Sequence, residues 1–250
     1  MFLKKFFMKK RKEIDIIIPI KNESKNLLIL FKLLKKNIKN KFLITLCYDG
    51  VDDDIHNNLK KLKKIGLRFF LLKNKGSGPC EAVKTALLKS KSDCCIVYPA
   101  DDFKNTSLID DMIEEFDDGC HIVAPSRFMQ GGSMKKCPLL KNILVRFFSF
   151  TLYRLSSIPV QDASNGFRLF SKELIKKVSI ESKLGFAYSL ELLVKCHRLG
   201  MKITQIPASW EERINGKSNF KILDWSKEYL KWYFYGLNTS WFNKKRVNLK

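Results

Sequence analysis

The chain has 250 residues, 45% of them hydrophobic and 29% charged, which is long and apolar enough for a buried core and excludes a disordered protein. Its formal net charge of +22 indicates an anionic partner such as nucleic acid, a membrane surface or a phosphorylated substrate, although a lysine-rich solvated surface gives the same total. The seven cysteines include no Cys-x-x-Cys pair, which argues against a zinc site or a disulfide framework and favours a reducing compartment.

Strand and helix patterns alternate through the first half of the chain. Continuous apolar, β-branched runs predict buried strands, and apolar residues at helical spacing predict the helices between them. In chain order the predicted elements are strand 14–20, a helix around 27–38, strand 42–48, helix 55–64, strand 67–72, helix 80–90, strand 94–98, helix 106–116 and strand 121–124. This alternation predicts an α/β fold with a mostly parallel sheet and helices on both faces.

The second half of the chain is less regular. It contains amphipathic patterns that predict helices at 139–156 and 186–199, followed by a strand at 202–208 and an aromatic-rich helix that ends near 236. There is no Pro-, Ser- or Gly-rich linker and no internal repeat, so we expect one domain. We divide the chain into a basic extension (1–12), the domain itself (13–220) and a C-terminal helix and tail (221–250).

The most informative segment follows the strand at 94–98. There the apolar run stops at Pro99 and Ala100, and two carboxylates, Asp101 and Asp102, come next. In an open α/β sheet, ligands bind beyond the carboxyl ends of the strands, and carboxylates there are suited to a divalent cation held against a phosphate. The alternative is a solvated turn that caps the next helix, because Asp is common at helix N-termini.

Polar residues also follow the other predicted strands. These residues are Pro19, Asn22 and Glu23 after the first strand, Asp49 after the second, and Asn74, Gly76 and Gly78 after the third. We expect all four loops to open into one crevice. Asp49 is placed to accept hydrogen bonds from a base or ribose, and the two glycines would let the backbone and the next helix N-terminus approach a phosphate.

These motifs, in this order, resemble family 2 glycosyltransferases, which have the GT-A fold. The family pattern is a strand ending in Pro-x-x-Asn-Glu, an Asp-Asp-Gly turn, Asn-x-Gly-x-Gly and an Asp-x-Asp metal motif. Later segments extend the match over residues 13–235 and are most similar to the dolichol-phosphate mannosyltransferase branch: 124–127 (Ala-Pro-Ser-Arg), 161–168 (Gln-Asp-Ala-Ser-Asn-Gly-Phe-Arg), 185–193, and Arg213 to Ser218. The sequence departs from the family pattern at Pro99, Tyr48 and Asn219.

The resemblance implies transfer of a sugar, with inversion, from a UDP- or GDP-linked nucleotide sugar. The residues it assigns to donor binding are Pro19, Asn22, Glu23, Asp49, Asn74, Gly76, Gly78, Ala100 and Asp101. It further implies Mg²⁺ or Mn²⁺ held by Asp101 with help from Asp102. Pro99 replaces the first Asp of the metal motif, so metal binding would rest on these two residues.

The acceptor is expected to be a polyprenyl phosphate, with a glycan hydroxyl of cell-envelope polysaccharide as the alternative. Arg127, Arg168, Arg213 and Lys217 are the candidates for binding an acceptor phosphate, each with the alternative of a surface salt bridge. A hydroxyl acceptor would need a base, for which Asp162 is the candidate. The alternative for Asp162 is a structural turn before Gly166.

Two segments suggest contact with an anionic membrane surface. The helix around 142–154 is apolar with Arg at its margins, and the C-terminal helix interleaves Trp and Tyr with Lys. We expect the first to pack against the sheet and the second to contact lipid. No apolar run reaches the ~20 residues of a membrane-spanning helix, so the sequence predicts a cytoplasmic protein, peripheral on the cytoplasmic face of the membrane.

Other functions remain open on the sequence alone. A nucleic-acid-binding protein would account for the charge, but the acidic loops 49–54 and 101–102 would repel phosphate in the absence of a metal, so no nucleic acid is expected as a partner. A sugar-phosphate nucleotidyltransferase would carry a Gly-rich basic signature where Pro19 to Glu23 stand. A transferase that binds donor without reacting is the third alternative, and Pro99 motivates it.

Overall fold

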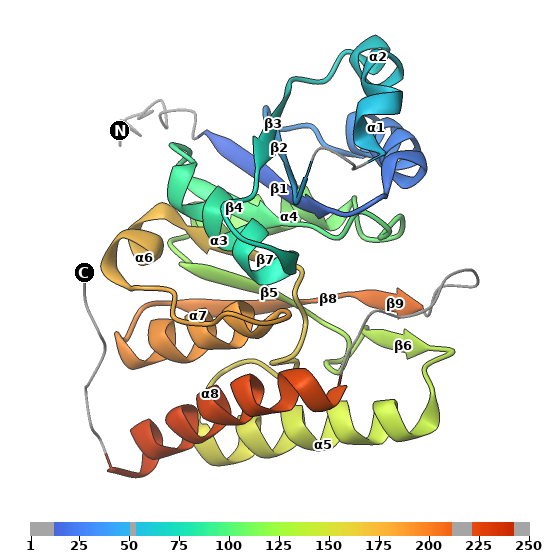
Figure 1. The fold of residues 1–250 in the computed structure, drawn as a ribbon. Coiled ribbons are helices and arrows are strands. Elements are labelled where there is room, and N and C mark those ends of the chain that lie inside the picture. Colours follow the sequence, from blue (N-terminus) through green and yellow to red (C-terminus); the bar gives the residue numbers. More distant parts are fainter. Residues whose placement is uncertain (1–12, 51–53, 212–221, 243–250) are drawn as a thin grey trace, which may run out of the picture.

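The computed structural model describes residues 13–50, 54–211 and 222–242. Their centre is a seven-stranded sheet in the order β3-β2-β1-β4-β7-β5-β8 (Figure 1). The strands in that order are β3 (Phe69–Lys73), β2 (Leu43–Tyr48), β1 (Ile14–Ile20), β4 (Cys94–Val97), β7 (Arg168–Ser171), β5 (Ile122–Ser126) and β8 (Ile203–Pro207). Only β7 runs antiparallel to its neighbours, so the other six strands direct their carboxyl ends to one edge.

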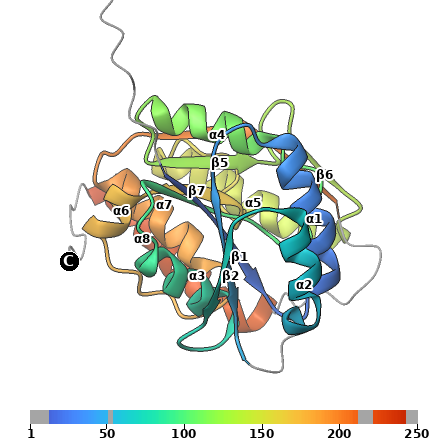
Figure 2. The ribbon, with the colours of Figure 1, turned by 90° about the horizontal axis from the view of Figure 1, so that it is seen from above.

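Helices cover both faces of the sheet (Figure 2). Helices α1 (Ser24–Asn37), α2 (Ile55–Ile65) and α4 (Leu108–Asp117) share one hydrophobic core with the sheet. The opposite core is built with α3 (Gly78–Lys89), α5 (Leu139–Ser156), α6 (Lys172–Lys177), α7 (Ala187–Arg198) and α8 (Ile222–Phe242). Central strands buried on both faces have to be continuously apolar, which is why β1 and β4 stand out in the sequence.

The predicted α/β fold with a mostly parallel sheet is confirmed. Four short elements were not predicted: the antiparallel strand β7, helix α6, and the strands β6 (Ser133–Lys135) and β9 (Ser209–Glu211), which pair with each other. Strand β7 escapes a periodicity argument because it is four residues long and begins with a charged residue, Arg168, that is nevertheless buried.

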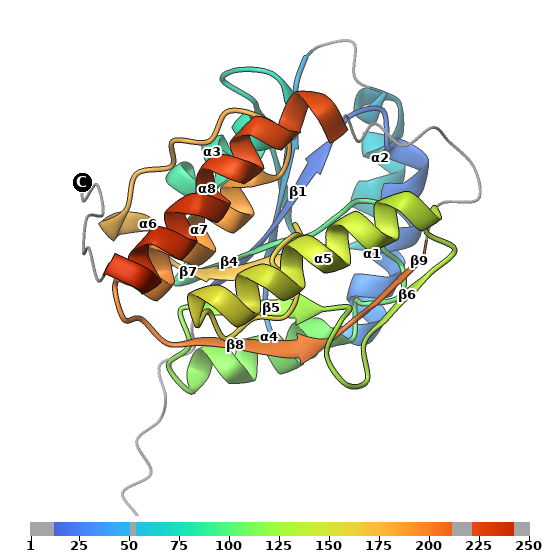
Figure 3. The same cartoon turned by 90° about the horizontal axis from the view of Figure 1, so that it is seen from below.

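The structure differs from the expectation for the two helices predicted to lie near a membrane. Helix α8 lies alongside α5 and packs on α7 (Figure 3), with Trp232 and Leu237 buried in the core. The Trp232 indole donates a hydrogen bond to Ser182 Oγ (2.8 Å), and Tyr233 donates one to Thr151 on α5 (2.9 Å). By contrast, α5, which was expected to pack, turns a large apolar face outward.

Within the described residues, no helix has the length and apolar composition that crossing a membrane requires. The predicted extension 1–12 and the proposed boundary between 220 and 221 lie outside the described residues. Six of the seven cysteines are buried and all seven are free thiols. Burial raises the pKa of the Cys47 and Cys80 thiols to about 12, so both stay protonated and inert at neutral pH.

Candidate functional site

Two of the predicted loops meet at the carboxyl edge of the sheet. Asp49, directly after β2, accepts hydrogen bonds from Asn74 Nδ2 (2.8 Å) and from the backbone N–H of Gly78 (3.0 Å). Asn74, directly after β3, in turn accepts the N–H of Gly76 (3.1 Å) and is itself buried. One carboxylate thereby fixes the loop after β3 and the first residue of α3 at the end of β2.

The N-terminus of α3 lies within this arrangement. Gly78 has φ +83°, a backbone conformation that residues with a Cβ rarely adopt, and Pro79 follows it in the first turn. The helix dipole gives this end a partial positive charge, but the Gly78 N–H is already taken by Asp49 and Pro79 has no N–H, which leaves the backbone N–H groups of Cys80 and Glu81. A diphosphate at this edge would therefore meet backbone donors instead of side-chain cations.

The loop after β1 is held to the start of α2. Asp54 accepts hydrogen bonds from the backbone N–H of Ser24 (3.1 Å) and from its hydroxyl (2.8 Å), and Asn22 Oδ1 accepts the N–H of Asp54 (3.3 Å). Asn22 has φ +57°, a strained conformation for a residue other than glycine, and Glu23 accepts a hydrogen bond from Asn26. The acidic residues 52 and 53 lie outside the described residues.

The two carboxylates after β4 have different surroundings. Asp102 accepts the N–H groups of Lys104 (3.0 Å) and Asn105 (3.1 Å) and the Asn105 side chain (2.6 Å), and burial raises its pKa against the effect of these bonds. Asn105 also bonds both backbone groups of Ser209, which ties this turn to β9. Asp102 therefore shapes the turn, and Asp101 is a half-buried carboxylate beside it.

The fit of a divalent cation can be judged from these donors. Among the described residues, no three His, Cys, Asp or Glu side chains gather in a metal-binding arrangement. A site made by the protein alone is therefore not formed there. Mg²⁺, however, is commonly held by one or two carboxylates and completes its shell with phosphate oxygens and water. Asp101 fits that role, and such an ion would neutralise charge on a bound diphosphate.

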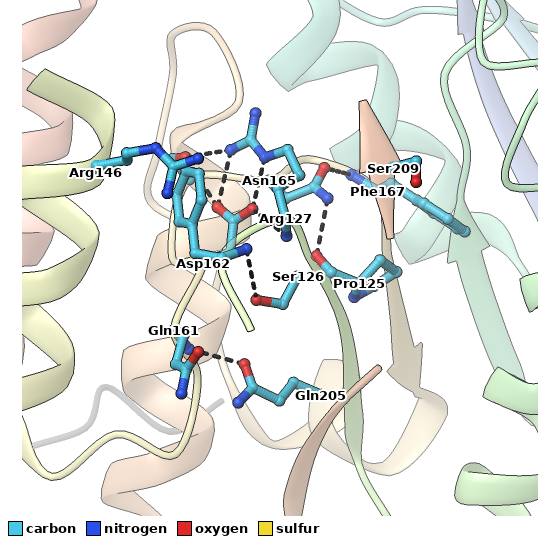
Figure 4. A network of polar contacts seen from close by, with 12 residues as sticks. Pro125, Ser126, Arg127, Arg146, Gln161, Asp162, Asn165, Phe167, Gln205 and Ser209 are labelled. Atoms are coloured by element: carbon cyan, nitrogen blue, oxygen red, sulfur yellow. Dashed lines mark hydrogen bonds and ion pairs between the residues drawn. The ribbon is translucent and has the colours of Figure 1, made fainter. Parts of the chain in front are cut away.

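A second polar cluster lies at the end of β5, two strands from β4 in the sheet (Figure 4). Arg127 and Asp162 form a two-pronged ion pair: Nε donates to Oδ2 (2.6 Å) and an Nη donates to Oδ1 (2.8 Å), while the Arg127 backbone N–H also donates to Oδ2 (3.1 Å). Ser164 bonds both partners. Burial alone would raise the pKa of Asp162, but the Arg127 guanidinium outweighs it and lowers that pKa.

Asp162 is itself fully buried, in an ion pair whose Arg127 side chain is 10% exposed. Each carboxylate oxygen already accepts bonds from Arg127, and the lowered pKa makes it a weak proton acceptor. This geometry favours the structural alternative for Asp162. Its role becomes that of a positioning residue, which fixes the orientation of the Arg127 guanidinium.

Arg168 is also fully buried. It donates to the carbonyl oxygens of Ser189 (2.8 Å) and Asp162 (3.0 Å), which ties the 161–168 segment to α7. Burial lowers its pKa to about 10, so it remains charged at neutral pH. Its side chain is enclosed by protein and is not exposed to an acceptor substrate. The other two predicted phosphate ligands, Arg213 and Lys217, lie outside the described residues.

The structure adds a cationic residue that the sequence reading did not assign to the site. Arg146 of α5 lies over the ring of Phe128 (4.7 Å), and Arg127 lies over the same ring (5.1 Å). Arg146 lines a hollow of about 450 Å³ with Phe128, Phe147, Phe150, Tyr153, Arg154 and Gln161. The available signal was an arginine at the margin of an apolar helix, but only the fold brings it beside Arg127.

The hollow and the loop cluster are two separate places on the protein. The hollow adjoins the Arg127–Asp162 pair through Phe128 and Gln161, whereas Asp49, Asn74 and Gly78 gather at the ends of β2 and β3. Strands β4 and β5 run in the same direction with β7 between them, so Asp101 and Arg127 follow strand ends about 10 Å apart. The described residues thus place the carboxylates Asp49 and Asp101 towards one side of this edge and the guanidinium groups of Arg127 and Arg146 towards the other.

Comparison with known families identifies one model that matches, described as glycosyl transferase family 2, over residues 15–179. The matched segment contains the loops after β1 to β5 and the Asp162–Arg168 motif. It ends at the beginning of the region that contains α7 and α8.

Two curated relatives carry names that concern lipid-linked sugars. The chain is 26% identical over 190 residues to a dolichyl-phosphate beta-glucosyltransferase of Dictyostelium discoideum, covering 71% of this chain and 58% of the relative. It is 23% identical over 233 residues to a dolichol-phosphate mannosyltransferase of Pyrococcus furiosus, covering 88% of this chain and 64% of the relative. The chain thus spans less than two thirds of either protein's length.

Among solved structures, the fold is similar to that of glucosyl-3-phosphoglycerate synthase from Mycobacterium tuberculosis. The complex with Mn²⁺, UDP-glucose and phosphoglyceric acid superposes with a TM-score of 0.65 at 14% identity, covering 91% of this chain and 80% of that one. At this identity the similarity concerns the fold alone.

Proposed function

Because the chain belongs to glycosyltransferase family 2, we propose that it transfers a sugar from a UDP- or GDP-linked donor to a polyprenyl phosphate. The observation that carries the proposal is the arrangement at the carboxyl edge of the sheet. There Asp49, Asn74 and Gly78 form one hydrogen-bonded unit at the ends of β2 and β3. Asp101 follows β4, two strands from β2 in the sheet, and Arg127 follows β5, two strands further along. A nucleoside, a diphosphate and an anionic acceptor fit this order of groups.

The donor half of the reaction uses the loops of the first four strands. Asp49 would accept hydrogen bonds from the nucleoside, and the N-terminus of α3 would lie near the diphosphate. When the bond between the anomeric carbon and the diphosphate oxygen breaks, the electron pair stays on the diphosphate. A cation held by Asp101 would stabilise that charge. The chain's own contribution is to hold the leaving group while the acceptor approaches from the opposite side of the sugar.

The acceptor half is proposed to bind a phosphate. A phosphate oxygen is already ionised and attacks the anomeric carbon without giving up a proton, whereas a hydroxyl needs a base. Asp162, the carboxylate predicted for that task, is bound in a buried pair with Arg127 and has a lowered pKa. The same pair fixes one guanidinium beside a second, Arg146, above the Phe128 ring. This geometry supports a phosphate acceptor over a hydroxyl acceptor.

A lipid-linked acceptor further suggests that the protein works at an anionic membrane surface, on the cytoplasmic face. The net charge of +22 is consistent with attraction to anionic lipid. The relatives named for dolichyl phosphate provide the chemical precedent.

The proposal can be tested with the purified chain, radiolabelled UDP and GDP sugars, Mg²⁺ or Mn²⁺, and polyprenyl phosphate in detergent. We expect a lipid-soluble labelled product with one donor family, and none when the unphosphorylated polyprenol replaces the phosphate. Transfer to polyprenol or to a free sugar would contradict the phosphate acceptor. The absence of both transfer and a thermal shift with any nucleotide would contradict the donor assignment as well.

A further inference from the structure

Helix α5 has its amphipathic character inverted relative to a helix on the surface of a soluble protein. Its polar residues Ser149 and Ser156 are fully buried. Large apolar residues face outward instead: Leu139 is 75% exposed, Leu140 70%, Phe147 66% and Phe150 57%, and Ile143 and Leu144 are exposed by about half. At 100° per residue these six side chains occupy one continuous stripe.

The stripe is bordered by basic residues. Arg146 and Arg154 are exposed on the same helix, and Arg154 lies over the Phe150 ring (5.5 Å). At the N-terminal end, Lys141 lies over the indole of Trp210 (5.0 Å), and Lys135 and Lys136 are exposed just before the helix. Acidic residues are absent from α5. An apolar stripe with a cationic border and an adjacent Trp is the surface that an anionic lipid interface binds.

The rest of the surface does not offer an equal alternative. Among the side chains described on α8, only Leu230 and Phe234 are large, apolar and exposed. A second copy of the chain is a poor occupant of the stripe, because two surfaces bordered by Arg and Lys, each on a protein of net charge +22, repel each other. Scattered exposed apolar residues such as Phe70 on β3 are ordinary, whereas six in one stripe are not.

We propose that the outward stripe of α5 inserts into the interface of an anionic bilayer and sets the orientation of the protein on the membrane. The helix would lie in the membrane plane, with Arg146, Arg154 and Lys141 at the level of the headgroups. The inference deepens the proposed function, on which it rests only for the identity of the lipid acceptor. In this orientation the hollow next to Arg127 would face the membrane, because four of its lining residues belong to the exposed part of α5: Arg146, Phe147, Phe150 and Arg154.

The test is co-sedimentation of the full chain with vesicles, without any sugar substrate. Vesicles of phosphatidylcholine with 30% phosphatidylglycerol are compared with pure phosphatidylcholine. We expect binding to the anionic vesicles at least tenfold tighter than to the neutral ones. The double variant Phe147→Gln with Phe150→Gln should weaken binding at least tenfold, because two large apolar side chains are removed from the lipid contact.

Matched variants make the result specific to this face. Phe70→Gln on β3 and Phe234→Gln on α8 remove similarly exposed rings from other elements and should change binding less than twofold. A second double variant, Leu140→Gln with Ile143→Gln, tests the other end of the stripe. Because all four α5 positions are exposed, melting temperatures should stay close to that of the unchanged chain; loss of binding by both double variants with retained melting supports the inference.

Several outcomes would overturn it. Equal binding to neutral and anionic vesicles, or no binding to either, removes the lipid partner. A loss with Phe234→Gln as large as with the α5 variants moves the contact to α8, and retained binding by both double variants excludes the stripe. Because no sugar is present, these results are independent of the transfer assay, so a failed transfer with intact vesicle binding would reject the proposed function alone.

Discussion

The charged groups of the two halves of the sheet edge do different work. On the proposed donor side, Asp49 and Asp101 are half-buried and lie at the ends of parallel strands, and the Asp49 carboxylate holds two loops together through hydrogen bonds from uncharged donors. On the acceptor side, Asp162 and Arg168 are fully enclosed. Charges that remain accessible can bind ligands, whereas enclosed charges hold the backbone that carries the ligand-binding groups. The predicted site residues therefore divide into those that can contact a ligand and those that hold the backbone in place.

The comparison makes substitution at Asp162 the most damaging change to the fold. Asp162→Asn leaves the largely buried Arg127 guanidinium without its counter-charge, and removing one partner of a buried pair costs about 3–5 kcal/mol. Urea denaturation of the purified variant measures the loss. Asp111→Asn, an exposed carboxylate on α4, is the matched control and should change the free energy of unfolding by no more than about 0.5 kcal/mol.

The pH dependence of the same variant gives a second readout. The pKa of Asp162 is lower in the folded protein than in the unfolded chain, where it is about 3.9. The stability contributed by its charge is therefore complete above about pH 4 and is lost as the pH falls through the lower folded value. The difference between the native chain and Asp162→Asn should be constant from pH 5 to 8 and shrink below pH 4. A difference that grows on acidification would contradict the ion pair.

On the donor side, substitution should affect activity and leave the fold intact. Asp101→Asn removes the carboxylate proposed to hold a cation at the leaving diphosphate, and losing one such stabilising group lowers kcat by about 10²- to 10³-fold. The free energy of unfolding should change by less than about 1 kcal/mol. The assay is the transfer reaction with Mg²⁺ or Mn²⁺ titrated.

Asp102→Asn is the control that separates the two neighbouring carboxylates. Its amide oxygen can still accept the N–H groups of Lys104 and Asn105, and only the bond from the Asn105 side chain is lost, so kcat should fall less than tenfold. Equal losses for the two variants would show that the cation needs both side chains. An activity that is insensitive to Asp101→Asn would remove Asp101 from the mechanism.

The same comparison explains how far the sequence could be interpreted. The loops proposed to bind the donor were predictable because parallel strands align their ends, so a local motif after each strand is enough to place Asp49, Asn74 and Gly78 together. The acceptor side depends on long-range packing. Nothing local to Arg168 indicates that a strand will insert antiparallel between β4 and β5 and enclose it.

Helix α5 shows the same limit from the opposite direction. Its periodicity predicts an amphipathic helix correctly over 139–156, but periodicity alone does not say which face the rest of the chain will cover. The aromatic side chains of α8 have the composition of a membrane-facing helix, and the core takes Trp232 because its indole finds a partner in Ser182. Composition thus identified two apolar helices, and the packing determined which of them has a large apolar face exposed.

A smaller effect is expected from the hydrogen-bonded unit at Asp49. Asp49→Ala removes the acceptor for Asn74 Nδ2 and for the N–H of Gly78, which loosens two loops at once. Leaving these donors unsatisfied costs about 1–3 kcal/mol, and if nucleotide binding has to re-order the loosened loops, the same free energy weakens the nucleotide Kd roughly 5- to 150-fold. Isothermal titration calorimetry with UDP and GDP measures it.

The control for Asp49 lies at the opposite edge of the sheet. Asp93 also accepts a backbone hydrogen bond, from Glu13 (2.9 Å), but it precedes β4 and is far from the carboxyl ends. Asp93→Ala should leave the nucleotide Kd unchanged. Equal weakening by both variants would mean that Asp49 acts through general stability and not through the donor loops.

The smallest predicted effect tests whether the backbone at α3 matters beyond its strain. Gly78→Ala adds a Cβ that meets no atom within 4 Å, so its cost comes from φ +83° alone and should be about 1–2 kcal/mol of stability. Gly119→Ala places the same Cβ in open space at φ +91°, before β5 at the opposite edge, and should cost a similar amount. Thermal melts compare the stabilities, and calorimetry compares the nucleotide affinities.

Because the Gly78 N–H is held by Asp49, only Gly78→Ala should also weaken nucleotide binding. Two variants equally destabilised but unequal in nucleotide affinity would place the donor at this end of α3, and equal affinities would place it elsewhere.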